Sequence, residues 1–287
     1  MAPEFTAQAD LGELLAAFRR TGAVVIRGLA PRDLLADLQA SFVAAMRRAL
    51  DQVGVPAAGD DPDELFAALR VASPEHAATT LTLGRDFPAF FSLVGAFAGT
   101  SQVRALAGSE TLQIAGDLCL LRVDAPNADE TGFDWHQDYP YNLMARRAVT
   151  VWAPLAPVTD EMGLLKFIPG SHSDLLPIDI RRGVARRHTG QRQVAISGLD
   201  RMAPDFERRA ETLQPLGAGD VLIFDSHLLH RSGANRSARS RWVFNARYGD
   251  LLDAELVGRR WYTTRAKYPH LVADIHPELV TWVEDAE

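Results

Sequence analysis

A histidine and a carboxylate stand two residues apart in the stretch FDWHQDYPYN, residues 133–142. If this stretch is extended, alternate side chains point to the same face, so His136 and Asp138 project together while Gln137 points away. Two such groups can share a metal ion. An HxD pair is nevertheless common by chance and usually forms a surface ion pair. A metal site therefore requires a third ligand from another part of the chain.

The stretch GDVLIFDSHLLHRSGANRSARSRW, residues 219–242, offers that ligand. His227 and His230 end an apolar strand, and a turn-forming run separates them from Arg241, which a returning antiparallel strand would carry back alongside the histidine. Two histidines and one carboxylate are the facial ligand set of non-haem Fe(II) oxygenases, whose open positions accept a bidentate cosubstrate and dioxygen. An arginine beside such a site suits a cosubstrate with a distant carboxylate.

Three stretches in this order carry a resemblance to a known family: WHQDYPY, VTVWAPLAPVTDEMGLLKFIPGSH and GDVLIFDSHLLHRSGANRSARSR. Together they resemble the phytanoyl-CoA dioxygenase family of Fe(II)- and 2-oxoglutarate-dependent oxygenases, over about residues 110–250. The resemblance implies O2 as the oxidant, succinate and CO2 as co-products, and hydroxylation of an unactivated carbon of a small molecule. Desaturation, ring closure and epimerisation belong to the same chemistry and remain open, as does the identity of the substrate.

Carried over residue by residue, the resemblance implies that iron is bound by His136, Asp138 and His230. The family places its distal ligand directly before an SG-containing turn, and HRSGAN has this form. This position favours His230 over His227. His172, in PGSH, is interpreted as a structural residue of a loop that follows a strand.

The resemblance also assigns residues to the cosubstrate. Ser232 and Arg241 match the positions whose hydroxyl and guanidinium hold the far carboxylate of 2-oxoglutarate. Trp152 resembles a tryptophan that lines the cosubstrate pocket, and a core tryptophan on a strand is an equal alternative. If Arg241 is not the anchor, Arg239 and Arg247 are the next candidates.

Candidates for binding the primary substrate come from position alone. Tyr139 and Tyr141 follow the first ligands and can line the substrate pocket, with aromatic packing at a barrel rim as the alternative. The segment 178–193, IDIRRGVARRHTGQRQ, is expected to be a loop, and its arginines include Arg186 and Arg187. If it covers the barrel mouth, these arginines suit an anionic substrate; otherwise they form a solvated surface.

The sequence pattern changes near residue 110, from helical to strand-forming. Before it, apolar residues recur at helical spacing, as in residues 32–50, and Asp10 with Glu13 forms a capping box for a helix that closes near Gly22. After it, short strand-forming runs alternate with turns. These patterns predict a mostly β antiparallel sandwich or barrel, with a jelly roll among the options and with N-terminal helices packed outside. The resemblance implies a double-stranded β-helix (jelly-roll, cupin-like barrel). We expect one domain over residues 1–287: a helical support region (1–109), the jelly-roll core (110–250) and a C-terminal extension (251–287). Expected strands include TLQIAG, LCLLRVD, AVTVWAPL, LLKFIPGS, RQVAISG, DVLIFDSHLLH and RWVFNARYG.

Composition narrows the class of protein. The chain has 287 residues, 47% of them hydrophobic, and a formal net charge of -7, which argues against a nucleic-acid partner. The single cysteine, Cys119, rules out an internal disulfide and a CxxC zinc site. The first residues, MAPEFTAQAD, have neither a basic start nor an apolar run, and no window could span a membrane. The expectation is a cytoplasmic protein without a membrane partner; the oligomeric state stays open.

Two rival classes use related architectures. A halogenase of this kind needs a vacant position where Asp138 supplies a carboxylate, so this class is disfavoured. A non-redox metal protein of the cupin type, whether an isomerase or epimerase or a binding protein, also uses histidine and acidic ligands. Such a protein does not require Ser232 and Arg241 beyond its last histidine, and binding of 2-oxoglutarate to the metal-loaded protein separates the two classes.

Overall fold

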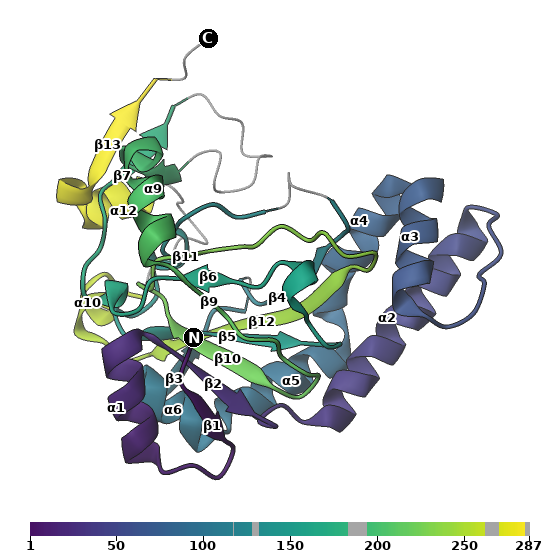
Figure 1. Cartoon of the computed structure of the whole chain (residues 1–287), viewed down its shortest axis with the longest axis horizontal. Helices are drawn as coiled ribbons and strands as arrows, with labels where there is room; N and C mark the ends of the chain where they lie inside the picture. The colour runs from purple at the N-terminus through teal and green to yellow at the C-terminus, as the bar shows by residue number, and fades with distance from the viewer. Residues whose placement is uncertain (117, 128–131, 183–193, 262–269, 285–287) are drawn as a thin grey trace.

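Helices dominate the first part of the chain, and strands dominate the part that follows (Figure 1). The computed structural model describes residues 1–116, 118–127, 132–182, 194–261 and 270–284. The helices are α1 (Leu11–Thr21), α2 (Arg32–Gln52), α3 (Pro62–Ala72), α4 (Pro74–Leu83), α5 (Pro88–Ala98), α6 (Ser101–Ala107), α7 (Tyr139–Asn142), α9 (Leu199–Arg209), α10 (Ala254–Gly258) and α12 (His270–Ile275). Short 3-10 turns are η1 (Gly84–Asp86), η3 (Asp160–Met162), η4 (Ser171–Ser173) and η5 (Pro277–Leu279).

A seven-stranded sheet forms the centre of the fold, in the order β1-β2-β10-β5-β12-β3, with β4 also paired to β12. Its pairs are antiparallel apart from β1 with β2. Two three-stranded sheets, β11-β6-β9 and β13-β7-β8, complete the described strands. The strands are β1 (Glu4–Thr6), β2 (Ala23–Arg27), β3 (Leu112–Ile114), β4 (Leu120–Asp124), β5 (Ala148–Pro154), β6 (Lys166–Phe167), β7 (Ile178–Arg181), β8 (Val194–Ile196), β9 (Glu211–Thr212), β10 (Val221–Asp225), β11 (His230–Arg231), β12 (Arg241–Asp250) and β13 (Val280–Val283).

Strand alternation divides the residues of the large sheet between two faces. On β12 the even-numbered residues from Trp242 to Tyr248 join a core shared with α2, α5 and α6. The odd-numbered residues from Arg241 to Arg247 turn to the opposite face, where Val243 joins a cluster with Phe167 of β6 and with Leu213, which follows β9. Successive side chains of a strand point to opposite faces, so one strand serves both layers. The helices therefore cover one face of the sheet, and the small sheet β11-β6-β9 faces the other.

The N-terminal helices form as their apolar spacing predicts. On α2 the core-facing stripe includes Leu38, Phe42 and Met46, each no more than 1% exposed, and the Phe42 ring lies edge-on to Trp242 of β12 at 6.1 Å. At α1 the Asp10 side chain accepts a hydrogen bond from the backbone N–H of Glu13. This is one of the two hydrogen bonds of the predicted capping box, and it is confirmed. The helical spacing thus places the apolar sides of these helices in one core with the sheet.

The end of α1 requires a glycine. Gly22 has φ of +78°, and a Cβ built there would lie 2.5 Å from Nδ1 of His172. A side chain at this position would therefore meet both backbone strain and a clash. His172 packs against the end of α1, as expected of a structural residue.

Two parts of the expected fold are corrected. The structure contains more helix than the expected mostly β fold, because helices fill most of the first 107 residues. The expected loop 178–193 begins as strand β7, which pairs in parallel with β13 and antiparallel with β8. Helix α9 was not foreseen because Pro204 lies inside it and few apolar residues mark its buried side. The arginines Arg186 and Arg187 lie outside the described residues.

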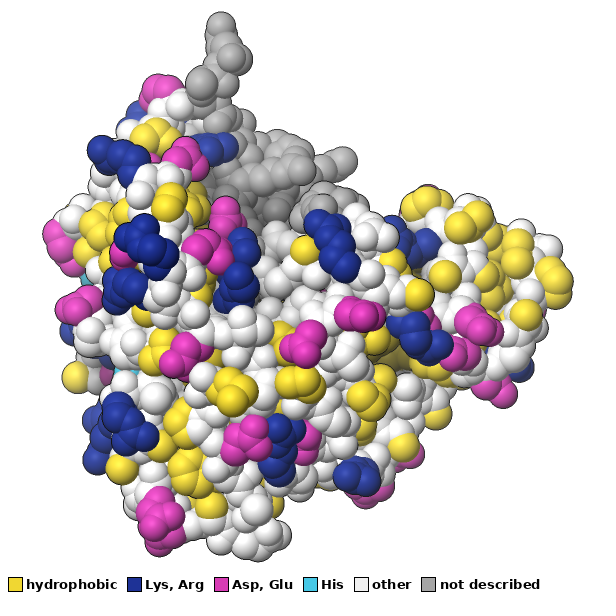
Figure 2. Space-filling model, viewed as in Figure 1, with side chains coloured by type: hydrophobic (Ala, Val, Ile, Leu, Met, Phe, Trp, Pro, Cys, Tyr) yellow, Lys and Arg dark blue, Asp and Glu magenta, His cyan; other side chains and the backbone are white. Residues whose placement is uncertain are grey.

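The outer surface carries both signs of charge. On the face shown in Figure 2, basic and acidic side chains are interspersed, and apolar side chains gather at the right-hand end, over α3, α4 and the loop between α2 and α3. Among the described helices none is both long enough and apolar enough to cross a membrane.

Candidate metal and cosubstrate site

Three buried side chains from separate parts of the fold converge on the face of the large sheet opposite the helices. His136, Asp138 and His230 each offer a ligand atom, and these atoms all lie within 4.8 Å of one another. The two histidines lie opposite each other in an isolated antiparallel bridge, with backbone N···O distances of 2.9 and 3.0 Å. Their ring centroids are 4.2 Å apart. The structure therefore brings together the three residues that the sequence selected as metal ligands.

The backbone conformation that places His136 and Asp138 at the site differs from the expected one. The stretch 133–142 is not a continuous strand, because Asp138 has φ of -69° and ψ of -30° and directly precedes α7. Its carboxylate faces the site because the backbone turns there into a single helical turn. The prediction that His136 and Asp138 project together was right, although the reason given for it, an extended segment, was wrong.

Backbone carbonyl groups orient both histidine rings. Nδ1 of His136 lies 2.6 Å from the carbonyl oxygen of Asp134, and Nδ1 of His230 lies 2.8 Å from that of Leu228. A carbonyl oxygen only accepts hydrogen bonds, so each Nδ1 carries a proton and Nε2 is the ring nitrogen that can face a metal ion. Burial and the neighbouring His136 lower the pKa of His230 to about 3, which keeps its ring neutral. The rings are thus prepared to coordinate a metal through Nε2.

Asp138 is held ionised by its neighbours. Its Oδ2 accepts a hydrogen bond from Thr150 Oγ1 at 2.8 Å and lies 3.4 Å from Nη2 of Arg247, while Oδ1 lies 3.6 Å from Nε2 of His136. Burial alone would raise the pKa of Asp138, but the charge of Arg247 and the contacts with His136 outweigh burial and lower it well below its ordinary value. One carboxylate oxygen is therefore anchored by the protein, and the other faces the two histidines.

Thr150→Val is expected to weaken Fe(II) binding about tenfold, because loss of one outer-sphere partner of a metal ligand typically has an effect of at least this size. Valine keeps the shape of threonine but cannot donate to Asp138, so the carboxylate loses one of its two anchors. Anaerobic Fe(II) titration measures the change in dissociation constant. Thr281→Val, at an exposed position on β13, is the control, and equal affinities for the two variants would contradict the role of Thr150.

Gln137 ties the ligand segment to its surroundings. Its Nε2 donates to the carbonyl oxygens of Asp174 and His227 at 2.8 and 2.6 Å, and its Oε1 accepts from the backbone N–H of Leu176 at 2.8 Å. The side chain is 3% exposed and does not belong to the group of potential metal ligands. Sequence reasoning missed this function because its partners lie far away in the chain.

A cavity of about 100 Å³ opens onto the three ligands. Its lining is apolar on one side and strongly basic on the other. Besides the ligands, the lining residues are Leu120, Arg122, Phe133, Trp152, Leu165, Phe224, Ser232, Arg241, Asn245 and Arg247. Ser232, Arg241 and Trp152, the residues assigned to the cosubstrate, therefore all face the same space as the metal ligands.

Arg241 reaches this cavity from the large sheet. The expected pairing of its strand with the strand of His230 is wrong, because β12 pairs with β4 and β5 whereas β11 pairs with β6. Arg241 lies opposite Asp124 in the register, and its Nε and Nη2 bond Oδ2 of Asp124 at 3.1 and 2.8 Å. Its Nη1 donates to the carbonyl oxygen of Met162 at 3.2 Å. One N–H on each Nη remains without a partner among the described residues, and two such groups match a carboxylate.

Asp124 joins two arginines at the basic side of the cavity. Arg122 bonds its carboxylate through Nε at 2.8 Å, and the Arg122 guanidinium lies 4.6 Å from the centre of the Phe133 ring. Burial lowers the pKa of Arg241, while Asp124 opposes that effect and favours the charged form. Three arginines and two carboxylates, Asp124 and Asp138, leave one positive charge in excess here. No local pattern in the sequence pointed to Asp124 or Arg122.

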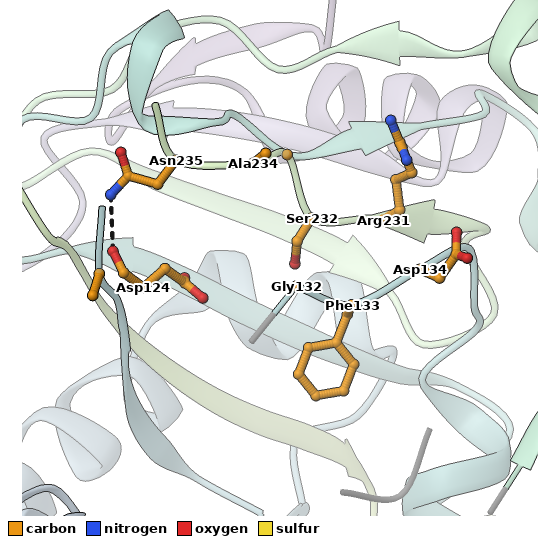
Figure 3. A pocket seen from close by; sticks show the side chains of 10 residues that line it. Asp124, Gly132, Phe133, Asp134, Arg231, Ser232, Ala234 and Asn235 are labelled. Atoms are coloured by element: carbon orange, nitrogen blue, oxygen red, sulfur yellow. Dashed lines mark hydrogen bonds between the residues drawn. The ribbon is translucent and has the colours of Figure 1, made fainter. Parts of the chain in front are cut away.

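A second cavity, of about 320 Å³, adjoins the cavity that opens onto the metal ligands. Figure 3 shows Asp124, Phe133 and Ser232 around it, together with Asp134 and Arg231. Phe133 and Ser232 line both cavities. These two residues therefore form the boundary between the cavity at the metal ligands and the second cavity.

The remaining candidates are distributed differently. The His227 ring packs edge-on against Tyr139 at 4.7 Å, outside the three-residue ligand group. The expectation that Tyr139 lines the substrate pocket is not supported, because it is 1% exposed and its hydroxyl contacts Glu255 and His276. Tyr141 instead lies edge-on to His136 at 5.8 Å and lines a further cavity of about 440 Å³.

Comparisons with known proteins agree with this geometry. The phytanoyl-CoA dioxygenase family model matches residues 18–243. Phytanoyl-CoA dioxygenase domain-containing protein 1 of Danio rerio is 30% identical over 113 residues, which cover 38% of this chain and 36% of that protein. L-Proline trans-4-hydroxylase of Streptomyces griseoviridis is 30% identical over 141 residues, 44% of this chain and 52% of that protein. The chain thus spans about half or less of these relatives.

Solved structures show the same fold. The non-haem alpha-ketoglutarate-dependent carbocyclase SnoK from nogalamycin biosynthesis has a TM-score of 0.51 and 20% identity, with 86% of each chain covered. EvdO2 from Micromonospora carbonacea var. aurantiaca has a TM-score of 0.50 and 20% identity, with 84% of this chain and 91% of that chain covered. At this identity the likeness concerns the arrangement of the chain.

Proposed function

Because the chain belongs to the phytanoyl-CoA dioxygenase family, we propose that it is an Fe(II)- and 2-oxoglutarate-dependent dioxygenase. Its reaction hydroxylates an unactivated carbon of a small molecule and forms succinate and CO2. The observation that carries this proposal is the buried group of His136, Asp138 and His230 at the edge of a basic cavity. EvdO2, which shares the fold, has been solved in complex with 2-oxoglutarate.

The donor set fits Fe(II). Two imidazoles and one carboxylate on one side of an ion match the facial arrangement that leaves positions open for a cosubstrate and dioxygen. His136, Asp138 and His230 would hold the ion, and Thr150 and Arg247 would hold Asp138. Iron bound together with 2-oxoglutarate and O2 supplies the oxidising power that cleavage of an unactivated C–H bond requires.

The basic side of the cavity fits a dicarboxylate. In the proposed complex the far carboxylate of 2-oxoglutarate accepts hydrogen bonds from the two remaining N–H groups of Arg241. It accepts a further hydrogen bond from the hydroxyl of Ser232. The excess positive charge in the cavity favours the anion, and a carboxylate bound to arginine by two parallel hydrogen bonds is held in one orientation. Trp152 and Phe224 line the apolar side of the cavity and exclude water from it. The jelly-roll barrel expected of this family would then place the cosubstrate between the two facing sheets.

The primary substrate is proposed to approach from the side of Tyr141. The cavity of about 440 Å³ is lined by Tyr141 and by Asp134, whose carbonyl group orients His136. Its described lining also contains Asp179, Asp200 and Arg181. The three proposed ligands do not line this cavity, so a substrate held there would have to extend past Tyr141, whose ring packs against His136, to bring its reacting carbon to the metal.

The charge of the substrate remains a separate proposal. Replacing Arg186 and Arg187 with glutamine is expected to weaken binding of an anionic substrate and to uncouple 2-oxoglutarate consumption from product formation. The physical reason is that guanidinium groups bind carboxylates and phosphates through paired hydrogen bonds. Product and succinate yields measured together test it, and unchanged coupling in the double variant would mean that the arginines are solvated surface.

A screen for substrate-stimulated succinate formation tests the function as a whole. The Fe(II)-loaded protein is incubated with 2-oxoglutarate and a metabolite library, and each hit is examined by mass spectrometry. A product that has gained one oxygen atom indicates hydroxylation; loss of two hydrogens indicates desaturation or ring closure, and an unchanged mass indicates epimerisation. A protein that binds metal but not 2-oxoglutarate would contradict the proposal.

A further inference from the structure

A glutamate on α9 contacts both chain segments that carry the proposed metal histidines. Oε1 of Glu207 accepts a hydrogen bond from Nε1 of Trp135 at 3.1 Å and lies 2.9 Å from Nε of Arg231. Trp135 directly precedes His136, and Arg231 directly follows His230. The other carboxylate oxygen, Oε2, accepts from Nζ of Lys166 at 2.9 Å.

Lys166 extends this arrangement to a third segment. It lies on β6 directly opposite Arg231 of β11, so the two cations that flank Glu207 belong to paired strands. The Arg231 guanidinium also lies 5.8 Å from the centre of the Trp135 ring. One carboxylate therefore joins the segment before His136, the strand that contains His230 and the strand beside it.

Helix α9 is attached to Trp135 at two points. The Phe206 ring lies edge-on to the indole at 5.8 Å, and Glu207 accepts the indole N–H. Trp135 is 2% exposed, so its N–H needs a partner within the protein. Burial raises the pKa of Glu207, but Lys166 and Arg231 outweigh it, and the carboxylate is ionised.

The backbone joins the two histidine segments at separate points and not along a continuous strand ladder, so side-chain contacts add to their alignment. The bridge between His136 and His230 is isolated, and β11 has only two residues. Beyond the bridge, the backbone N–H of Ser232 donates to the carbonyl oxygen of Phe133 at 2.8 Å and that of Tyr139 to Ser226 at 2.9 Å, whereas a full strand ladder would continue the pairing from residue to residue. Restraints on the neighbouring side chains therefore have a direct effect on the separation of the two rings.

We propose that Glu207 is a positioning residue that holds His136 and His230 at metal-binding separation by joining Trp135, Arg231 and Lys166. The inference rests on the proposed function, because it takes these histidines to be metal ligands. Glu207 itself does not contact the metal or the cosubstrate. Its effect must therefore appear in metal affinity and in the histidine rings more than in the stability of the fold.

A purely structural role predicts a different result. The side chains of Glu207, Lys166 and Arg231 are each about one-third exposed, at 36%, 34% and 33%. Exposed ion pairs usually contribute little to stability. If Glu207 only forms such pairs, its removal leaves metal affinity unchanged.

The test compares Glu207→Ala and Glu207→Gln with Asp205→Asn. Asp205 lies on the same helix, is exposed, and forms ion pairs with Arg208 and Arg209 only along α9. Anaerobic Fe(II) titration is expected to show about tenfold weaker binding for Glu207→Ala, the lower end of the range for outer-sphere partners of metal ligands. Glutamine can still accept from Trp135 but forms no ion pairs, so Glu207→Gln should fall between Glu207→Ala and the wild type. Asp205→Asn should bind as the wild type does.

A second measurement uses the metal-free protein. Imidazole NMR signals of His136 and His230 are expected to shift in both Glu207 variants and to remain in place in Asp205→Asn. Wild-type affinity and unshifted signals in the Glu207 variants would overturn the proposal, as would an equal loss in Asp205→Asn. If Glu207→Ala does not fold, Glu207→Gln and Trp135→Phe, which removes only the indole N–H, decide the matter by the same two readouts.

A His230→Ala sample distinguishes this failure from a failure of the proposed function. If His230→Ala still binds Fe(II) as the wild type does, the metal assignment itself is wrong, and the inference about Glu207 falls with it. If His230→Ala loses the metal while the Glu207 variants keep full affinity, only the positioning role is refuted.

Discussion

His230→Ala is expected to abolish the visible charge-transfer absorption that develops when 2-oxoglutarate chelates Fe(II) at an open facial site. The reason is that His230 supplies one of the two Nε2 lone pairs, and its ring is held in that tautomer by the carbonyl oxygen of Leu228. Asp138→Ala should have the same effect, because the carboxylate is the only acidic member of the ligand group found among the described residues. The absorption is measured anaerobically as 2-oxoglutarate is added to the iron-loaded protein.

His227→Ala is the matched control for this experiment. His227 is three residues away, is also buried, and packs against Tyr139 instead of facing His136. Its removal should lower stability through lost packing while the absorption band persists in the folded protein. Loss of the band in His227→Ala together with its survival in His230→Ala would reverse the ligand assignment.

Arg241→Ala is expected to raise the half-saturating concentration of 2-oxoglutarate at least about tenfold and to leave the Fe(II) dissociation constant nearly unchanged. Each charge-assisted hydrogen bond that is lost contributes about 1.5 to 3 kcal/mol, and about 1.4 kcal/mol corresponds to a tenfold change. The metal ligands do not bond Arg241, whose partners are Asp124 and Met162. Titration of cosubstrate-dependent succinate formation, together with Fe(II) titration, measures the two effects separately.

Two further variants sharpen this result. Removing Arg241 leaves a buried carboxylate, Asp124, with Arg122 as its remaining partner, and breaking a buried pair is destabilising. Arg241→Lys keeps the charge but cannot offer two parallel N–H groups, so it should retain the fold and still bind 2-oxoglutarate weakly. Arg239→Ala, which disrupts an exposed pair with Asp61, is the control.

An unaltered 2-oxoglutarate dependence in both Arg241 variants would identify another anchor. Arg247 is the next candidate because it lines the same cavity. Its replacement would be recognised by a second effect: Arg247 also holds Asp138, so Arg247→Ala should weaken Fe(II) binding together with cosubstrate binding. An anchor that is independent of the metal would affect cosubstrate binding alone.

Short-range patterns in the sequence marked the proposed ligands, and the family resemblance selected His230 over His227. His136 and Asp138 lie two residues apart, and His230 directly precedes a turn-forming run, so each is marked by its immediate neighbours. The same holds for the two faces of β5 and β12, because alternation along a strand is a local property. The apolar stripe of α2 and the cap at Asp10 were likewise readable from spacing.

No local sequence pattern identified the groups that orient the ligands. Thr150 holds Asp138, and Asp124 holds Arg241 across 117 residues of chain. Gln137 and Glu207 have partners in other strands and loops. Each of these side chains has an ordinary local context, and its role depends on which distant segment packs against it.

Strand pairing separates what the sequence determined from what only the tertiary structure decided. The sequence determined the ligand types, their spacing and which residues of each strand share a face. The tertiary structure decided that β12 lies beside β4 and β5, so that Arg241 meets Asp124 and lines the same cavity as His230. The physical reason is that a two-residue period fixes the face of a strand but not its neighbour. The neighbour is selected by burial of apolar surface that the whole chain supplies.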